Sequence, residues 1–334
     1  MQLDTLRQRL RALGAKPAHE ARFLRAWVQA RSLDNRKSRA EDFLPLALRE
    51  ALPEIGAELD ALARVRSEHP GADGSARLLV ELADGQTVES VLLPRDGLCV
   101  SSQVGCAVGC VFCMTGRDGL LRQLGSAEIV AQVVLARRRR LVKKVVFMGM
   151  GEPAHNLDNV LDAIDFLGSF GGIGHKNLVL STVGDRRVFA RIGSGPVKPA
   201  LALSLHTTKA DLRAQLLPRA PRLAPEEIVE LGEAYARASG YPIQYQWTLI
   251  EGVNDGEDEI DGIVRLLAGK YALMNLIPYN ATAALEFRRP AWEAATAMAQ
   301  ELHRRGVLTK LRDSAGQDVD GGCGQLRART LAGT

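Results

Sequence analysis

The sequence predicts an α/β fold of about six β/α units, preceded by a small N-terminal helical domain and a β-hairpin. Apolar runs of strand length alternate with segments of helical periodicity from about residue 125 onward. Residues 1–75 show helical periodicity only, and two runs typical of strands lie between these regions. The alternation of strands and helices predicts a parallel sheet with right-handed crossovers, either curled or doubly wound.

Apolar residues recur at helical spacing in the first part of the chain. Leu3 and Leu6 follow this spacing, as do residues 23–28, and a third apolar stretch is interrupted by Pro53. Turn-forming residues at 69–74 predict that this helical domain ends at about residue 75.

The same helical domain, residues 1–75, is locally basic. Residues 1–40 contain ten Lys or Arg residues against three Asp or Glu residues. This excess predicts an RNA-binding accessory domain, because phosphate contacts dominate the affinity for RNA. Solvated helix faces explain the same charges equally well.

The hairpin extension is predicted at residues 76–98. Runs of alternating residues at 76–82 and 87–93 flank Asp84-Gly85, and Asp-Gly between two such runs is a strong hairpin signal.

Residues 99–312 contain the predicted β/α units. We expect a helix N-cap at Ser126, because serine accepts a hydrogen bond from the first turn. The expected helices are 126–140, 157–167, a short one near 188, 226–238, 257–267 and 291–304. The expected parallel strands are 144–147, 178–180, 201–204, 244–249, 272–276 and 308–311. In such folds the chemistry collects at the carboxyl ends of the strands.

Composition and charge limit the class of protein. The chain of 334 residues is 46% hydrophobic and 25% charged, which is typical of a globular protein, and its net charge of +4 is compatible with nucleic acid. Its first residues do not resemble a signal peptide and no apolar run is long enough to span a membrane, so we expect a cytoplasmic protein without membrane association. Five cysteines in a reducing compartment favour metal or redox chemistry over disulfides.

Three of these cysteines, Cys106, Cys110 and Cys113, lie within eight residues and have no close fourth partner. Three thiolates on a four-iron cluster leave one iron open to a substrate, whereas ordinary clusters and zinc sites use four ligands. A structural zinc site completed by a histidine or by Cys323 is the alternative.

The C-x₃-C-x₂-C spacing is the signature of the radical S-adenosylmethionine (SAM) superfamily. Over residues 85–327 the chain further resembles the RlmN/Cfr family of radical SAM RNA (adenine) methyltransferases. The motifs that carry this resemblance are 98–106 (LCVSSQVGC), 147–153 (FMGMGEP), 201–206 (LALSLH), 251–255 (EGVND), 275–280 (NLIPYN) and 320–326 (DGGCGQL). The resemblance implies an open, partial β/α barrel of the radical SAM type. It also implies a [4Fe–4S] cluster on the three cysteines, with SAM bound to the open iron.

The family solves a chemical problem that the resemblance transfers to this chain. The target carbon of adenine is electrophilic, so the SAM methyl group does not attack it directly. Members first methylate one of their own cysteines, and a radical derived from a second SAM activates that methyl group to add to the ring. By resemblance, Cys323 carries the methyl group on a flexible loop formed by residues 313–334. Cys99 then releases the RNA by forming a disulfide with Cys323, and Glu89 accepts the proton.

The resemblance also implies the residues that contact SAM. Gly151 and Glu152 match the turn that binds the SAM amino group. The remaining SAM contacts follow later strands, and they are Ser181, Ser204, Leu205, His206 and Asn280.

The expected activity is methylation of an adenosine ring carbon in RNA, with carbon 2 favoured. The expected substrate is 23S rRNA, with tRNA also possible, and the expected electron donor is a flavodoxin or ferredoxin. We expect a monomer. Segments 314–318, 281–287 and 94–97 depart from the family pattern, and they lie where we expect contacts with the RNA substrate. Two alternatives therefore stay open, namely carbon 8 methylation or a different RNA, and a non-catalytic RNA-binding protein with a structural metal.

Overall fold

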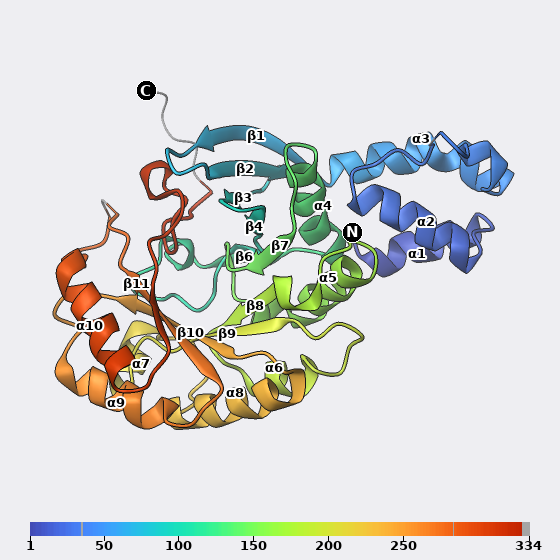
Figure 1. Ribbon diagram of the computed structural model, residues 1–334. Coiled ribbons are helices and arrows are strands. Elements are labelled where there is room, and N and C mark those ends of the chain that lie inside the picture. Colours follow the sequence, from blue (N-terminus) through green and yellow to red (C-terminus); the bar gives the residue numbers. More distant parts are fainter. Residues whose placement is uncertain (35, 283, 329–334) are drawn as a thin grey trace.

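The computed structural model describes residues 1–34, 36–282 and 284–328, and its centre is an open β/α barrel (Figure 1). Six β/α connections link seven parallel strands, each paired in parallel with the next in chain order. The strands are β4 (Gly97–Cys99), β7 (Lys144–Phe147), β8 (Leu178–Thr182), β9 (Ala200–Ser204), β10 (Ile243–Leu249), β11 (Ala272–Pro278) and β12 (Thr309–Leu311). The partial barrel is confirmed, because β12 pairs with β11 but not with β4.

Helices cover the outside of this sheet (Figure 1). They are α4 (Ser126–Arg137), α5 (Leu157–Ser169), α6 (Arg186–Arg191), α7 (Ala210–Leu216), α8 (Pro225–Ser239), α9 (Glu257–Leu267) and α10 (Trp292–Arg304). Helix α7 was not predicted. The expected N-cap at Ser126 was wrong, since Ser126 is the first helical residue and Gly125 occupies the cap position. The hydroxyl of Ser126 instead accepts a hydrogen bond from the backbone N–H of Leu3 at 2.9 Å.

Antiparallel strands extend the barrel sheet beyond β4. The predicted hairpin is confirmed as β2 (Ala76–Leu82) and β3 (Thr87–Leu93), and β3 pairs with β4. Strand β1 (Ala63–Pro70) pairs with β2 and forms the outer edge. The helical unit is therefore shorter than residues 1–75, because residues 63–70 belong to the sheet.

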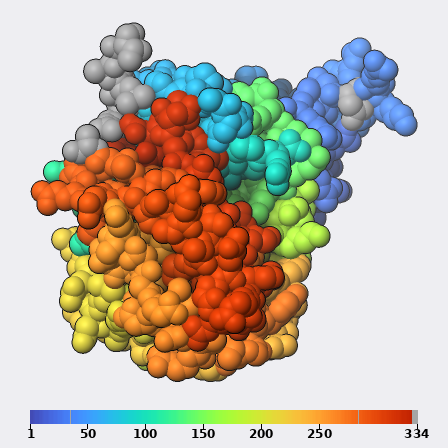
Figure 2. Space-filling model, turned by 60° about the vertical axis from the view of Figure 1, so that its left-hand side comes forward, coloured from blue at the N-terminus to red at the C-terminus, as the bar shows by residue number. Residues whose placement is uncertain are grey.

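Three helices precede β1, namely α1 (Leu3–Ala12), α2 (Pro17–Val28) and α3 (Leu46–Ala61). Helix α3 continues through Pro53, so the expected interruption was wrong. Helices α1 and α2 pack against the barrel, where the rings of Trp27 and Phe166 meet at 5.7 Å and Arg137 donates to the carbonyl of Val28 at 2.9 Å. Helix α3 projects away from the barrel (Figures 1 and 2).

Shorter elements complete the chain. A two-stranded sheet consists of β5 (Gln103–Gly105) and β6 (Leu120–Gln123). The short 3-10 helices are η1 (Ala40–Asp42), η2 (Met114–Gly116), η3 (Pro153–Asn156), η4 (His175–Asn177) and η5 (Gln317–Val319). The C-terminal segment lies beside the β1–β3 sheet (Figures 1 and 2), and the end of the predicted 313–334 loop, residues 329–334, lies outside the described residues.

Candidate active site

The three-cysteine loop is held between β5 and β6. The backbone N–H of Cys106 donates to the carbonyl of Gly119 at 2.9 Å, which closes the loop at its base. Gly105 has φ of +77°, and a Cβ atom there would lie 2.0 Å from the same carbonyl oxygen. Only glycine fits this position, because any other side chain would force the two strands apart.

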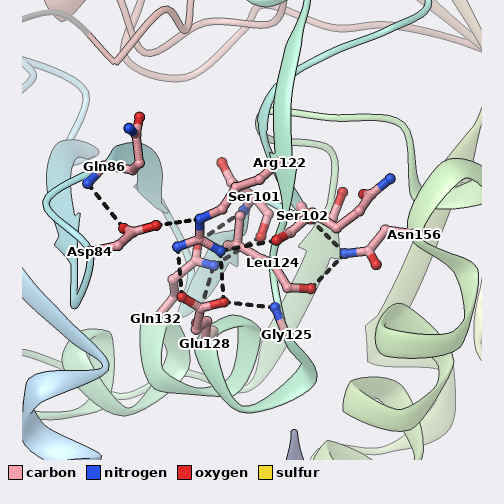
Figure 3. A network of polar contacts seen from close by, with 11 residues as sticks. Asp84, Gln86, Ser101, Ser102, Arg122, Leu124, Gly125, Glu128, Gln132 and Asn156 are labelled. Atoms are coloured by element: carbon pink, nitrogen blue, oxygen red, sulfur yellow. Dashed lines mark hydrogen bonds and ion pairs between the residues drawn. The ribbon is translucent and has the colours of Figure 1, made fainter. Parts of the chain in front are cut away.

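A buried polar network holds the segment that leads into this loop (Figure 3). The Gln132 side chain on α4 bonds both backbone groups of Ser101, at 2.9 Å each. The amide of Asn156 donates to the carbonyls of Ser102 and Leu124, at 2.8 and 2.7 Å. The backbone that carries the cysteines is therefore fixed by side chains from two helical elements, and sequence reasoning did not find either residue.

An arginine joins this network to the hairpin (Figure 3). Arg122 on β6 forms a two-pronged ion pair with Glu128 at 2.8 and 3.0 Å and donates to Asp84 in the hairpin turn at 2.6 Å. Glu128 also accepts from the backbone N–H of Gly125 at 2.7 Å, which satisfies the start of α4. These charge-assisted contacts tie the hairpin, β6 and α4 together.

The three predicted ligands line one open cavity with an empty volume of about 860 Å³, which we call the cluster cavity. Burial raises the pKa of the Cys106 thiol to about 12 and that of Cys110 well above its usual value, and Cys113 adds to both shifts. The other predicted residues on its wall are Gly151, Glu152, Ser181, Ser204, His206 and Cys323. The structure thus brings predicted residues from the ends of four strands, β5, β7, β8 and β9, to one cavity.

Glu152 is buried at the carboxyl end of β7. Its carboxylate accepts from the backbone N–H of Ala154 and of Val183, both at 3.0 Å, and from the hydroxyl of Thr182 at 2.5 Å. Burial nevertheless raises the pKa of this carboxyl group. These bonds join the ends of β7 and β8 and leave one oxygen with a single partner, which is open to a cation in the cavity.

The fold itself requires a glycine at position 151. Its φ is +105°, and a Cβ atom would lie 2.6 Å from Cβ of Gln103. Ser181 is the next-to-last residue of β8 and Ser204 is the last residue of β9, and both line the same cavity.

His206 follows β9 with φ of +64°, which is uncommon for a residue other than glycine. Its Nδ1 accepts from the backbone N–H of Thr248 at 2.9 Å, and its ring meets Phe112 edge to face at 4.9 Å. Burial, with a contribution from Arg213, lowers the pKa of His206 to about 3. His206 is therefore neutral at physiological pH, whereas Leu205 is buried and does not line the cavity.

Arg213 is a site residue that the sequence analysis missed. It extends from α7 and donates to the carbonyls of Val183 and Ser204, so it braces two strand ends. Burial lowers its pKa to about 10, and the nearby Cys110 and Glu152 partly oppose that shift. No sequence signal pointed to it, because α7 itself was not predicted.

Cys323 lies on a loop that is tied to the three-cysteine loop. The backbone N–H of Met114 donates to the carbonyl of Gly324 at 2.8 Å, and the hydroxyl of Thr115 donates to Leu326 at 2.7 Å. The amide of Asn280 donates to the carbonyl of Cys323 at 2.9 Å. Asn280 does not line the cluster cavity, so its contact is with the loop of Cys323.

Cys99 and Cys323 both line a second cavity with an empty volume of about 610 Å³, which we call the cysteine cavity. Cys113 lines it as well, so it adjoins the cluster cavity. Cys99 is buried, and burial together with the neighbouring Cys323 raises the pKa of its thiol. Cys323 is exposed on the cavity wall, yet the surrounding protein raises the pKa of its thiol too.

Glu89 is placed differently from the other predicted residues. Its carboxylate forms a buried ion pair with Arg77 and accepts from the backbone N–H of Arg327 at 2.6 Å and of Ala328 at 2.9 Å. It lines neither the cluster cavity nor the cysteine cavity. The structure therefore does not bring Glu89 together with the other site residues, and its role as proton acceptor stays a prediction.

The donor set fits an iron–sulfur cluster by its chemistry, since three thiols on one wall are the soft ligands that iron clusters use. Within residues 1–34, 36–282 and 284–328, no group of three His, Cys, Asp or Glu side chains is close enough to hold a metal ion. Among the described residues, the three thiols therefore line one cavity but do not converge on a position for a single metal ion.

Comparison with known protein families identifies the superfamily that has this arrangement. A model of the radical SAM superfamily matches residues 100–267, which include the three-cysteine loop and the strand ends around the cluster cavity. The chain belongs to the radical SAM superfamily. Radical SAM proteins use SAM and a [4Fe–4S] cluster, so this protein is a SAM-dependent enzyme, and the three cysteines are the residues that would hold the cluster.

Similar proteins match over nearly the full chain. A probable RNA methyltransferase of Azoarcus sp. (strain BH72) is 79% identical over 331 residues, which cover 99% of this chain and 95% of that protein. A probable RNA methyltransferase of Pseudomonas aeruginosa is 69% identical over 336 residues, with coverage of 100% and 97%. The chain belongs to the same family as these proteins.

A solved structure confirms the architecture of the radical SAM chain. The crystal structure of a radical SAM methyltransferase from Sphaerobacter thermophilus is similar with a TM-score of 0.85 and 34% identity, over 98% of both chains.

Among the described helices, none is both long and apolar enough to cross a membrane.

Proposed function

We propose that this protein is an RNA methyltransferase of the RlmN/Cfr type, which adds a methyl group to a ring carbon of an adenosine. Carbon 2 is the favoured position, and 23S rRNA is the favoured substrate. The relatives with 79% and 69% identity are named probable RNA methyltransferases, which supports RNA as the substrate class. A cytoplasmic location and a flavodoxin or ferredoxin as electron donor accompany this proposal.

One observation carries the proposal, namely that Cys323 lies on the walls of both the cluster cavity and the cysteine cavity. A carrier sulfur at this residue would have SAM near it in the cluster cavity and Cys99 near it in the cysteine cavity. A purely RNA-binding protein needs neither lone cysteine. A radical methyltransferase with a cysteine carrier needs both.

The cluster and SAM would supply the radical that activates the carrier methyl group. The residues of the chain then divide the remaining work. Glu152, with one oxygen oriented by a single backbone N–H, would bind the SAM ammonium group. The sulfur of Cys323 would hold the carbon that joins the adenine ring.

Release of the product follows from the cysteine cavity. The thiolate of Cys99 would attack the sulfur of Cys323, so that an S–S bond forms while the bond from that sulfur to the methylene carbon breaks. The electron pair passes to the RNA carbon, which takes up a proton and becomes the methyl group. A cellular dithiol must then reduce the disulfide before the next turnover.

The test is nucleoside mass spectrometry of RNA from cells with and without the gene, with the purified enzyme as a second arm. We expect one methyladenosine to disappear from rRNA when the gene is deleted. We also expect anaerobically purified enzyme with SAM and a reductant to restore it. Unchanged RNA in the deletion strain, together with no transfer in vitro, would refute the proposal.

A further inference from the structure

The interior of the barrel contains a third cavity with an empty volume of about 1290 Å³, which we call the lumen cavity. It lies at the open side of the barrel, between the Leu93–Gly97 connection and the segment that follows β12, and it reaches Cys323. Met148, Gln246 and Ile277 also line both this cavity and the cluster cavity. A molecule that enters by the open side of the barrel therefore arrives at the carrier cysteine.

Three cations line the lumen cavity, namely Arg95, Lys144 and Arg312. Within the part of the chain that the structure describes, the side chains of Arg95 and Lys144 form no ion pair or hydrogen bond. Arg312 donates through Nε to the side-chain oxygen of Asn275 at 2.5 Å, and among the described residues its terminal nitrogens form no hydrogen bond or ion pair. This part of the wall therefore has spare donors for a ligand.

The positive charges that line the lumen cavity are not neutralised by a free acidic side chain on its wall. Asp313 is its acidic lining residue, and this carboxylate already accepts from Arg289 at 2.7 Å and from Gln317 at 2.5 Å. Burial lowers the pKa of Lys144, and the positive charges of Arg312 and Lys310 lower it further. Like charges gathered in a partly buried space favour an anionic occupant.

We propose that the lumen cavity is a nucleotide site in which Lys144, Arg312 and Arg95 bind a phosphate group adjoining the adenosine presented to Cys323. This inference rests on the proposed function, and it goes further by placing the RNA backbone inside the barrel. Arg and Lys are the residues that bind phosphate, by charge and by several N–H donors.

The location of these cations also gives a role to the connector 94–97, which departs from the family pattern. Arg95 lies in the short connector 94–97, with φ of +60°, and its exposed side chain reaches the cavity from the hairpin side. Arg312 approaches from the opposite edge, directly after β12. The two residues border the open side of the barrel, where a strand of RNA would pass.

The test compares the binding of adenosine, 5′-AMP and 3′-AMP to the full-length, cluster-loaded enzyme by isothermal titration calorimetry. We expect at least one monophosphate to bind about tenfold or more tightly than adenosine, since a charge-assisted hydrogen bond contributes that much. The two isomers distinguish the phosphate on the 5′ side of the adenosine from the one on the 3′ side. Lys144→Gln combined with Arg312→Gln should abolish this advantage, and Lys144→Arg should retain it.

Arg222→Gln provides the matched control, because Arg222 is exposed and lines neither the lumen cavity nor the cluster cavity. Equal binding of adenosine and both monophosphates, no binding of any of them, or an advantage that survives the double variant would each overturn the inference. RNA methylation is measured separately. Activity without a phosphate advantage refutes only this site, whereas a phosphate advantage without methylation refutes only the proposed function.

Discussion

The chemistry at the scale of single residues depends on where two sulfur atoms lie. Cys99 is buried at the end of β4, and Cys323 lines the same cysteine cavity. Cys323 also belongs to the cluster cavity and the lumen cavity, so it is the one described cysteine common to the walls of all three. Under the proposed mechanism, a group attached to its sulfur would therefore be formed, used and released without leaving the site.

Substitution of each lone cysteine should give a different result. Cys99→Ala should accumulate a covalent protein–RNA adduct, because the carrier sulfur is then attacked by no thiolate. Cys323→Ala should form no adduct and no methylated RNA, because the carrier is absent. Denaturing gel electrophoresis with labelled RNA measures the adduct. Full methylation by either variant would contradict the two-cysteine mechanism.

His206 predicts a pH dependence of stability. Its pKa is about 3 in the folded protein against 6.5 in a free side chain, so the unfolded chain binds the extra proton. The contribution of this pKa shift to the free energy of unfolding is therefore fully present above pH 6.5. It is lost as the pH falls toward about 3, the pKa of His206 in the folded protein. Between pH 7.5 and 5.5 this loss amounts to about 1.4 kcal/mol.

The measurement is urea unfolding of wild type and His206→Asn at both pH values. Asparagine tolerates the positive φ, and its side-chain oxygen can accept from Thr248. We expect the variant to lose less stability on acidification than wild type. An identical loss in both proteins would show that His206 does not titrate in this way.

Motifs predicted the residues of the site better than they predicted what those residues contact. Cys106, Cys110, Cys113 and Glu152 line one cavity as expected. Asn280 contacts the backbone of Cys323 and does not line the cluster cavity, so its contact with SAM stays a prediction. Arg213 was missed, because a single arginine in a short helix leaves no sequence pattern.

At the scale of elements, a buried ion pair anchors the loop of Cys323 on both sides. Arg77 on β2 donates to the carbonyl of Val319 at 2.6 Å, before the cysteine. Glu89 on β3 accepts from Arg327 and Ala328, after the cysteine. The sequence analysis expected a flexible loop because the segment is rich in glycine. The anchors could not be predicted, since Arg77 and Glu89 lie about 240 positions away in the chain.

Glu89→Gln tests this anchor. It should lower the free energy of unfolding by about 3–5 kcal/mol, because the buried guanidinium of Arg77 loses its counter-charge. It should also speed proteolysis after Arg327. Glu81→Gln is the matched control on β2, where the exposed pair with Arg64 contributes less than about 1 kcal/mol. Lost methylation with an unchanged tail and unchanged stability would instead support Glu89 as the proton acceptor.

The regular elements themselves were largely predictable. Strands β2, β3 and β7 and helix α9 have the expected bounds, because each has a clear period and turn residues at its ends. The network of Arg122, Glu128 and Gln132 was not predictable, since it joins residues whose partners are set only by the folded sheet.

At the scale of the whole molecule, the hairpin and the N-terminal unit are more closely joined to the barrel than the sequence indicated. Strand β1 makes the hairpin part of one continuous sheet with the barrel. The bounds of this sheet could not be read from the sequence, because residues 63–70 carry charged residues at alternate positions and little apolar character. Deleting residues 1–75 would therefore remove a strand as well as the helices.

The structure also separates the basic residues of the N-terminal unit into two groups. Arg7 lies over the rings of Phe166 and Phe170 at 5.8 and 5.7 Å, and Arg22 lies 3.4 Å from the ring of Phe43. Arg11 pairs with Glu20 at 2.7 Å. These cations already have intramolecular partners, whereas Arg25, Arg31 and Arg36 are exposed on this unit and remain available to bind phosphate.

The last prediction concerns these three exposed arginines. An adenosine within folded RNA must be unstacked before it reaches Cys323, at a cost of a few kcal/mol, so a surface outside the site must hold the RNA. Replacement of Arg25, Arg31 and Arg36 by glutamine should reduce the salt slope of RNA affinity by roughly 0.7–0.9 for each phosphate group that is no longer bound. Filter-binding titrations over a salt series measure this slope. Glutamine at Lys176, Lys198 and Arg222, which are exposed on the barrel, removes the same charge elsewhere. Equal slopes for both triple variants would show that the N-terminal unit supports the barrel without gripping RNA.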